Sequence, residues 1–137
     1  MANGNPAASV RSFMDLEVWQ MGMSLSEDCY RLTRQFPSSE LYGLTAQIRR
    51  CSVSVPSNIA EGHGRESTQS FIQFLRIAQG STKELQTQLI LASRVELTTP
   101  ELVEPMLEKC DRVGKMLRSL IRSLERRQDN SASENGR

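Results

Sequence analysis

Apolar residues recur every three or four positions along four stretches of this chain, a spacing typical of helices that pack one face into a core. The first stretch covers about residues 14–36 and ends before Pro37, which cannot continue a helix. The second covers about residues 41–62, and Pro56 inside it predicts a kink because the apolar register continues past it. The expected buried positions of these two helices are Val18, Gly22, Leu25, Cys29, Leu32, Phe36, Leu41, Leu44, Ile48, Cys51, Val55 and Ile59.

The third stretch is the longest, about residues 67–96, and Ser67 is expected to cap its first turn. Gly80 lies inside it, and since a helical glycine costs about 1 kcal/mol relative to alanine, we expect two helices to approach closely there. The fourth stretch opens with Thr99 and Pro100, a capping residue followed by proline at the first helical position. The expected buried positions of these helices are Phe71, Leu75, Ala78, Thr82, Leu85, Leu89, Ala92, Val103, Met106, Cys110, Val113, Leu117, Leu120 and Leu124.

Four amphipathic helices with short connections predict an all-α fold, an antiparallel up-down-up-down four-helix bundle. With 137 residues, the chain has the length of one domain, and we place the bundle at residues 13–127. Residues 1–12 are expected to form a flexible N-terminal tail, and the polar residues 128–137 a disordered C-terminal tail. The sequence contains neither a signal-peptide pattern nor about 18 consecutive apolar residues, so we expect a cytoplasmic protein that does not associate with membranes.

The residues that most often carry chemistry are few and scattered. Three cysteines each fall on the expected buried face of a different helix, where a thiol acts as a small hydrophobic group and not as a disulfide or zinc ligand. The single histidine, His63, stands between two glycines without an evident catalytic partner. The sequence therefore predicts no metal site, no cofactor and no enzymatic activity.

Positive charge is concentrated in the fourth helix, although the whole chain has a formal net charge of only +1. Residues 109–127 include seven basic and two acidic side chains, and Lys115, Arg118, Arg122 and Arg126 recur on one outward face. This row is a candidate for binding the phosphate backbone of RNA or DNA. Because no aromatic residue interleaves with it, base stacking is not expected. The alternative is that the arginine stems only shield the apolar face of the helix.

Several short strings of the sequence together resemble one known family. They include FMDLEVWQ at residues 13–20, VPSNIAEG at residues 55–62 and FLRIAQGS at residues 74–81. In this order they resemble the four helix bundle proteins encoded in intervening sequences of bacterial 23S ribosomal RNA genes, over about residues 13–97. The resemblance implies a four-helix bundle that assembles as a homopentamer without known enzymatic activity. A related branch is the accessory variability determinant protein of diversity-generating retroelements, which pairs with a reverse transcriptase and binds nucleic acid through basic surface.

The sequence departs from the family pattern at two places, both at helix ends. Ser70 stands where a glutamate would complete a capping box with Ser67. Val95, Glu96 and Leu97 stand where family members often carry a Gly-Tyr turn. Neither departure changes the predicted fold.

A polar stripe on the second helix is a further candidate site. Its members are spaced by three or four residues, opposite the apolar face, and are Arg50, Ser54, Ser57 or Asn58, Glu61 and Arg65. Such a stripe suits a ligand pocket or a subunit contact, and the alternative is a solvated face with ordinary ion pairs. The resemblance adds an expected structural or interface role for Arg49, Arg50, Asn58 and Glu61.

Apolar residues outside the main buried positions predict a second contact surface. They are Trp19, Met21, Met23, Tyr30, Phe74, Ile77, Leu91, Leu107 and Ile121. A single bundle buries one stripe per helix, so this surplus favours self-association, and the alternative is a tightly packed monomer with a wide stripe. Three hypotheses remain: an oligomeric scaffold that binds nucleic acid, a module that binds only protein partners, and an enzyme with a site near Arg50, Asn58, Glu61 and His63.

Overall fold

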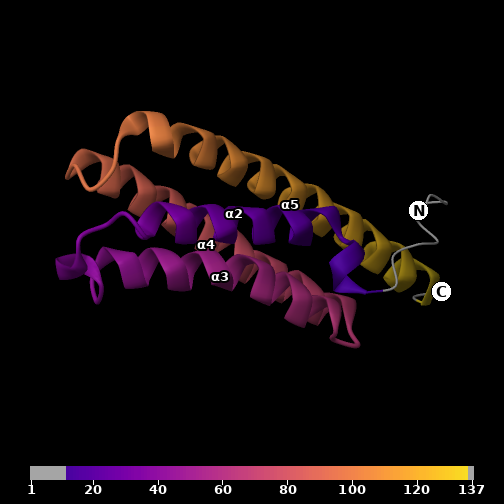
Figure 1. The fold of residues 1–137 in the computed structure, drawn as a ribbon. Helices are drawn as coiled ribbons and strands as arrows, with labels where there is room; N and C mark the ends of the chain where they lie inside the picture. The colour runs from indigo at the N-terminus through magenta and orange to yellow at the C-terminus, as the bar shows by residue number, and fades with distance from the viewer. Residues whose placement is uncertain (1–11, 136–137) are drawn as a thin grey trace, which may run out of the picture.

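The computed structural model describes residues 12–135 (Figure 1). Its elements are two short 3-10 turns and four long helices, and no strand occurs within these residues: η1 (Phe13–Asp15), α2 (Glu17–Thr33), η2 (Ser38–Glu40), α3 (Leu44–His63), α4 (Thr68–Arg94) and α5 (Pro100–Asn135). Consecutive helices run in opposite directions. Helix α3 packs between α2 and α4, and α5 closes the bundle against α4 and α2. The predicted antiparallel four-helix bundle is confirmed.

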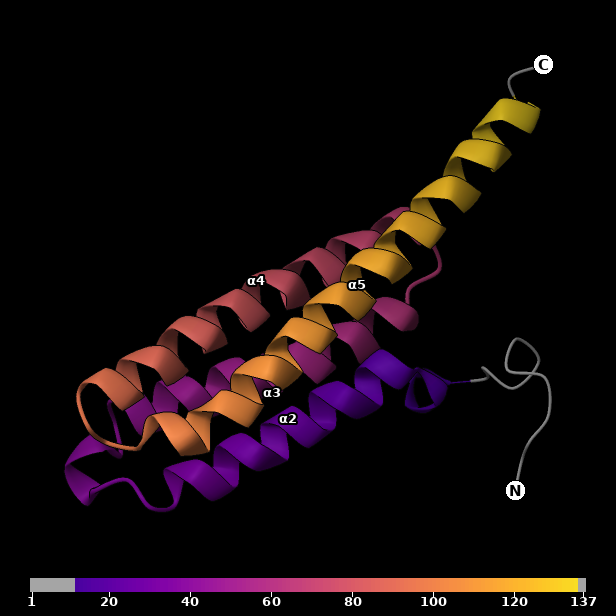
Figure 2. The ribbon, with the colours of Figure 1, turned by 90° about the horizontal axis from the view of Figure 1, so that it is seen from above.

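The expected tails differ from what the structure shows. Helix α5 continues to Asn135 and extends past the other three helices (Figure 2), so the prediction of disorder from residue 128 is wrong for residues 128–135. Neither glycine nor proline occurs between residues 115 and 135, so nothing in the sequence stops the helix. At the other end, the Ser12 hydroxyl accepts a hydrogen bond from the Met14 amide at 3.2 Å, which makes Ser12 part of the fold. Residues 1–11 and 136–137 lie outside the described part of the chain.

The core follows the predicted apolar positions with few exceptions. Every expected position on α2 and its C-terminal turn is buried, from Val18 to Phe36. Leu41 is 48% exposed because it precedes α3 and lies in a turn. Ile72 and Ile121 are buried, whereas the expected Phe71 and Leu120 pack against the core only partly. The expectation that Ile121 is surplus surface is therefore wrong.

Proline 56 is accommodated by a hydrogen bond from the neighbouring helix. Helix α3 runs through Pro56, whose missing N–H leaves the Ser52 carbonyl without its helical donor. The Ser26 hydroxyl of α2 donates to that carbonyl at 2.8 Å. Gly22, one turn earlier on α2, has no side chain, and a Cβ there would lie 3.5 Å from Pro56. The close approach of α2 and α3 thus brings the replacement donor within reach.

Capping residues at two helix starts match the prediction. The Ser67 hydroxyl accepts from the Ser70 amide at 3.0 Å, and Thr99 accepts from the Leu102 amide at 3.3 Å. The prediction for Gly80 is wrong, because nothing lies within 4 Å of where its Cβ would stand. The second close contact is instead at Gly62, where a Cβ would lie only 2.6 Å from Phe74.

Candidate functional site

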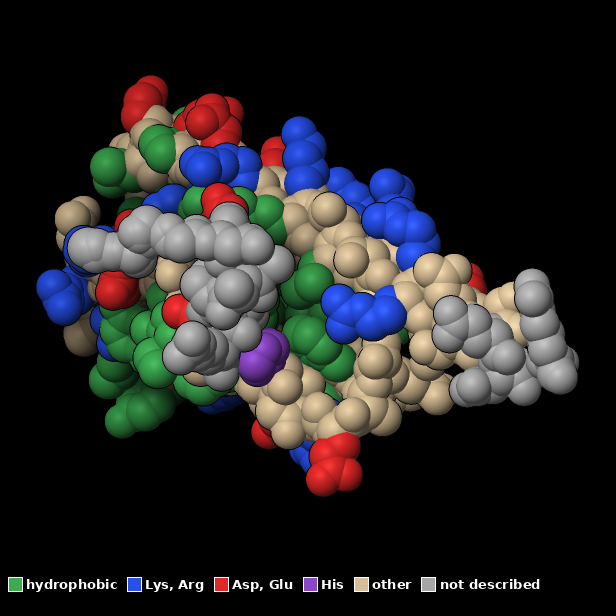
Figure 3. Space-filling view, turned by 90° about the vertical axis from the view of Figure 1, so that its right-hand side faces the viewer, with side chains coloured by type: hydrophobic (Ala, Val, Ile, Leu, Met, Phe, Trp, Pro, Cys, Tyr) green, Lys and Arg blue, Asp and Glu red, His purple; other side chains and the backbone are tan. Residues whose placement is uncertain are grey.

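A row of basic side chains on the outward face of α5 forms the candidate nucleic-acid surface. Together with Ser119, they line a surface groove of about 460 Å³, and all are exposed: Lys115, Arg118, Arg122 and Arg126. Figure 3 shows Lys and Arg side chains gathered along the upper right margin of the molecule, over helix α5. Among residues 12–135, no acidic side chain forms an ion pair with any of the four. Like charges three or four residues apart on a helix repel one another, so a bound anion would relieve that repulsion.

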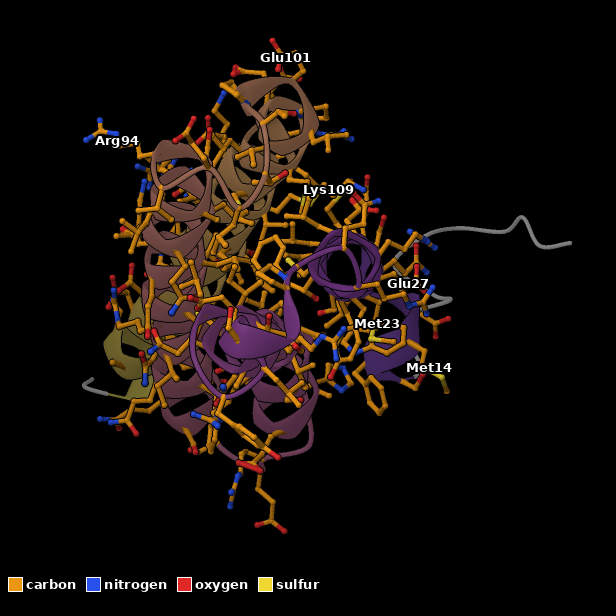
Figure 4. The ribbon with its side chains drawn as sticks, turned by 60° about the vertical axis from the view of Figure 1, so that its left-hand side comes forward. Met14, Met23, Glu27, Arg94, Glu101 and Lys109 are labelled. Carbon is orange, nitrogen blue, oxygen red and sulfur yellow. The ribbon has the colours of Figure 1, made fainter. Side chains whose placement is uncertain are left out.

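Lys109 and Glu125, in the same part of α5, form contacts between helices. Lys109 lies between α5 and α2 (Figure 4), and its Nζ donates to Asp28 Oδ2 at 2.6 Å and to Ser24 Oγ at 2.8 Å. Glu125 pairs with Arg76 of α4 at 2.7 Å. Some charged residues of α5 therefore join two helices, whereas the four basic residues of the exposed row form no ion pair with another helix of the described chain.

The polar residues on α3 divide among separate contacts. Arg49 joins α3 to α2, because its Nε donates to Thr33 Oγ1 at 2.8 Å and its guanidinium lies 4.6 Å from the Tyr30 ring centre. The Asn58 amide donates to the Ser54 carbonyl within the same helix at 2.8 Å. Arg50 is exposed and lines a groove between α3 and α4. No bound molecule is needed to account for the contacts of Arg49 and Asn58.

The remaining polar candidates lie at and just beyond the C-terminal end of α3. Glu61 and Arg65 form an exposed ion pair at 3.6 Å, and the Arg65 guanidinium lies 4.9 Å from the Phe74 ring centre. His63 packs edge-on against Phe71 with ring centres 5.8 Å apart. Within the described chain, no hydrogen bond or ion pair joins any two of Arg50, Asn58, Glu61 and His63. The residues of the enzyme hypothesis thus each have a different environment.

The three cysteines are buried and lie in the core cluster. Burial raises the pKa of each thiol to about 12, which keeps the sulfur protonated and weakly nucleophilic near neutral pH: Cys29, Cys51 and Cys110. Across residues 12–135, no three His, Cys, Asp or Glu side chains are grouped so that they could hold a metal ion. Over the same residues, no helix has both the length and the apolar content needed to cross a bilayer.

An apolar groove of about 620 Å³ lies between α2 and α3 on the outside of the bundle. Its lining includes Trp19, Met23, Tyr30, Val53, Pro56 and Ala60. Figure 4 shows Met23 and Glu27 projecting from the outward side of α2. Met23 and Tyr30 are exposed, as the surplus of apolar residues predicts, and so are Ile77 and Leu91 on α4. Sequence reasoning missed Arg31 and Arg34 at the rim of this groove, because single arginines carry no pattern.

Comparison with known proteins gives a family and a solved structure. The model of the family described as 23S rRNA-intervening sequence protein matches residues 14–119. No curated protein matches the chain. A crystal structure of a protein of unknown function from the S23 ribosomal protein family of Bacteroides thetaiotaomicron VPI-5482 is similar, with a TM-score of 0.69 and 25% sequence identity. The similarity covers 76% of this chain and 97% of that one.

Proposed function

Because the chain belongs to the 23S rRNA-intervening sequence protein family, we propose that it is a non-enzymatic cytoplasmic scaffold that assembles with copies of itself and binds nucleic acid along α5. The observation that carries this proposal is the exposed row of four basic side chains without acidic partners in the described chain. The resemblance noted in the sequence implies that the assembly is a homopentamer.

The dimensions of the basic row suit a phosphate backbone. Lys115 and Arg126 are 11 residues apart, which at 1.5 Å per residue is about 16 Å along the helix. One strand of a duplex advances about 3.4 Å per phosphate, so the row spans about five phosphate intervals. Cyclic assembly would repeat the row on every subunit and multiply the contacts. The row carries no aromatic side chain, so binding should depend on charge and not on base identity.

Self-association is supported by two apolar surfaces on different sides of the bundle. One is the groove between α2 and α3, with Arg31 and Arg34 at its rim. The other is a ridge on α4, where the exposed side chains Ile77, Glu84 and Leu91 recur every seven residues. Glu84 at the centre of the ridge complements the arginines of the groove. A contact between unlike surfaces of this kind forms a ring when the rotation closes.

Light scattering tests the assembly. We expect a mass several times the 15.4 kDa of one chain at micromolar protein concentration. Leu91→Arg should shift the mass towards the monomer, and Ser123→Arg at an exposed position of α5 is the matched control. A wild-type monomer at that concentration would rule out the scaffold.

Filter binding over a salt series tests the nucleic-acid surface. The affinity for RNA or DNA of random sequence should fall steeply between about 50 and 200 mM salt because bound phosphates release counterions. The double variant R118Q/R122Q should bind at least about tenfold more weakly and show a shallower salt slope. The control R50Q/R94Q removes the same charge from other exposed positions and should bind nearly as the wild type does.

A protein-binding module without nucleic-acid affinity is the second candidate. It is favoured by the volume of the α2–α3 groove, about 620 Å³, and by its apolar lining. If wild-type protein shows no salt-dependent binding, the nucleic-acid proposal is wrong and this candidate takes its place. The enzyme hypothesis predicts that replacing Arg50, Asn58, Glu61 and His63 together abolishes a function other than assembly.

A further inference from the structure

Two helices leave a hollow between them where two glycines face open space. The hollow lies between α4 and α5 and has a volume of about 400 Å³. Gly80 of α4 and Gly114 of α5 both line it. A Cβ at Gly80 would meet nothing within 4 Å, and one at Gly114 would meet only Arg118 Nη1 at 3.8 Å. Close packing therefore does not explain either glycine, although each costs about 1 kcal/mol relative to alanine in a helix.

The walls of the hollow are basic. They carry four basic side chains and one carboxylate: Arg76, Lys83, Lys115, Arg118 and Asp111. Arg76 pairs with Glu125 at 2.7 Å, and Asp111 Oδ1 accepts from Gln86 Nε2 at 2.9 Å. In the described chain, the other three cations have no acidic partner within ion-pair distance. The hollow therefore carries uncompensated positive charge.

The floor of the hollow is neutral and closed. Thr82 and Cys110 lie there and are almost completely buried. The Thr82 hydroxyl donates to the Ala78 carbonyl at 2.8 Å, so its hydrogen is already used. A poorly hydrated floor strengthens the attraction between the surrounding cations and a bound anion.

The hollow and the groove on α5 adjoin, since Lys115 and Arg118 line both, and we call the two together the channel. We infer that a single strand of nucleic acid follows this channel, lying along α5 and then sinking its phosphates between α4 and α5, where Gly80 and Gly114 make room for it. The inference rests on the proposed function and extends it, because it assigns binding roles to α4 as well as α5. Among residues 12–135, no aromatic ring lines the hollow, and its uncompensated cations favour phosphate groups.

Filling the hollow without changing its charge tests the inference. Gly80→Leu, Gly114→Leu and the double variant should fold, because a Cβ at Gly80 meets open space, one at Gly114 meets only the end of the Arg118 side chain at 3.8 Å, and leucine is a better helix former than glycine. The affinity of the double variant for a single-stranded RNA or DNA homopolymer should fall at least about tenfold at 50 mM salt. Gln73→Leu is the matched control, since it adds the same side chain to an exposed position of α4 outside the channel, and it should bind as the wild type does.

Removing one charge from α4 gives an independent measurement. Lys83→Gln should reduce the magnitude of the salt slope by about one counterion, although Lys83 lies outside the α5 row. If R118Q/R122Q binds weakly while Lys83→Gln and the glycine variants bind as the wild type does, the channel is wrong and the proposed function stands. If the wild type shows no salt-dependent binding, both are wrong.

Competition separates a strand from a small phosphorylated ligand. ATP or inorganic phosphate should displace the homopolymer only at millimolar concentration, because a strand gains from contacts along the whole channel. Saturable binding of ATP at micromolar concentration that the double glycine variant abolishes would overturn the strand path. Light scattering of each variant should give the wild-type mass, which shows that the lost affinity does not come from lost assembly.

Discussion

Replacing Ser26 by alanine should lower the free energy of unfolding by about 1–3 kcal/mol, the usual cost of a buried backbone group without a partner. Ser26 is 7% exposed and Ser52 is not exposed at all, so the Ser52 carbonyl is shielded from water in the wild-type protein. Pro56 cannot donate to that carbonyl. The Ser26 hydroxyl, at 2.8 Å, is the donor that the neighbouring helix supplies.

A double-mutant cycle with Pro56→Ala isolates this interaction. Alanine at position 56 restores an N–H that can donate to the Ser52 carbonyl within α3, so the hydroxyl on α2 is no longer needed. In that background, Ser26→Ala should cost at most about 0.5 kcal/mol, which gives a coupling free energy of about 1 kcal/mol or more. The effect of Pro56→Ala alone does not enter the test, because the cycle subtracts its lost packing and its gained helix propensity.

Urea denaturation at a single protein concentration measures all four proteins of the cycle, since self-association makes stability depend on concentration. Thr87→Ala is the control, because its exposed hydroxyl bonds only to the Lys83 carbonyl of its own helix, at 3.0 Å. That variant should be at least as stable as the wild type. An equal cost of Ser26→Ala in both backgrounds would show that the carbonyl at Ser52 is not what the hydroxyl stabilises.

Three further predictions concern the α4–α5 turn and the thiols. Glu96 has φ 65°, a left-handed conformation that costs a non-glycine residue about 1 kcal/mol. Glu96→Gly should therefore raise the free energy of unfolding, measured in urea, by about 1 kcal/mol. The control Glu101→Gly, in the first turn of α5, should lower the free energy of unfolding. The folded thiol pKa of about 12 lies above the ordinary 9.0, so the thiols' contribution to stability is fully present below pH 9 and is lost as pH rises from 9 towards 12. Near pH 8, a thiol reagent should modify the native protein only as fast as it opens, and rapid modification would contradict the burial of Cys29, Cys51 and Cys110.

Periodicity predicted most of the core because it depends only on helix geometry and side-chain polarity. Its error on α5 has a geometric origin. Strict alternation of three and four assumes 3.5 residues per turn, whereas a straight helix has 3.6 and drifts by about 20° per heptad. Ile121 lies 18 residues beyond Val103, which is five turns of a straight helix, so Ile121 and not Leu120 takes the buried position. The helical extension to Asn135 has another cause: a polar composition is typical of disorder, but it does not stop a helix.

The grooves could not be predicted, because they depend on which two helices lie side by side. Lys83 and Lys115 are far apart in the sequence and carry no common pattern, yet they face the same hollow once α4 packs against α5. The basic row on α5 could be predicted because one helix contains all of it.

The glycines, by contrast, could have been sorted from the sequence by their place in the helical period. Gly22 and Gly62 continue the buried positions of α2 and α3, and both meet a neighbouring helix. Gly80 lies two residues from the buried Ala78 and two from Thr82, which places it about 200° around the helix from each and so on the outward face. A glycine on that face gives neither packing nor helix propensity. What it gives is space beside Lys83, which the proposed path of the phosphates would occupy.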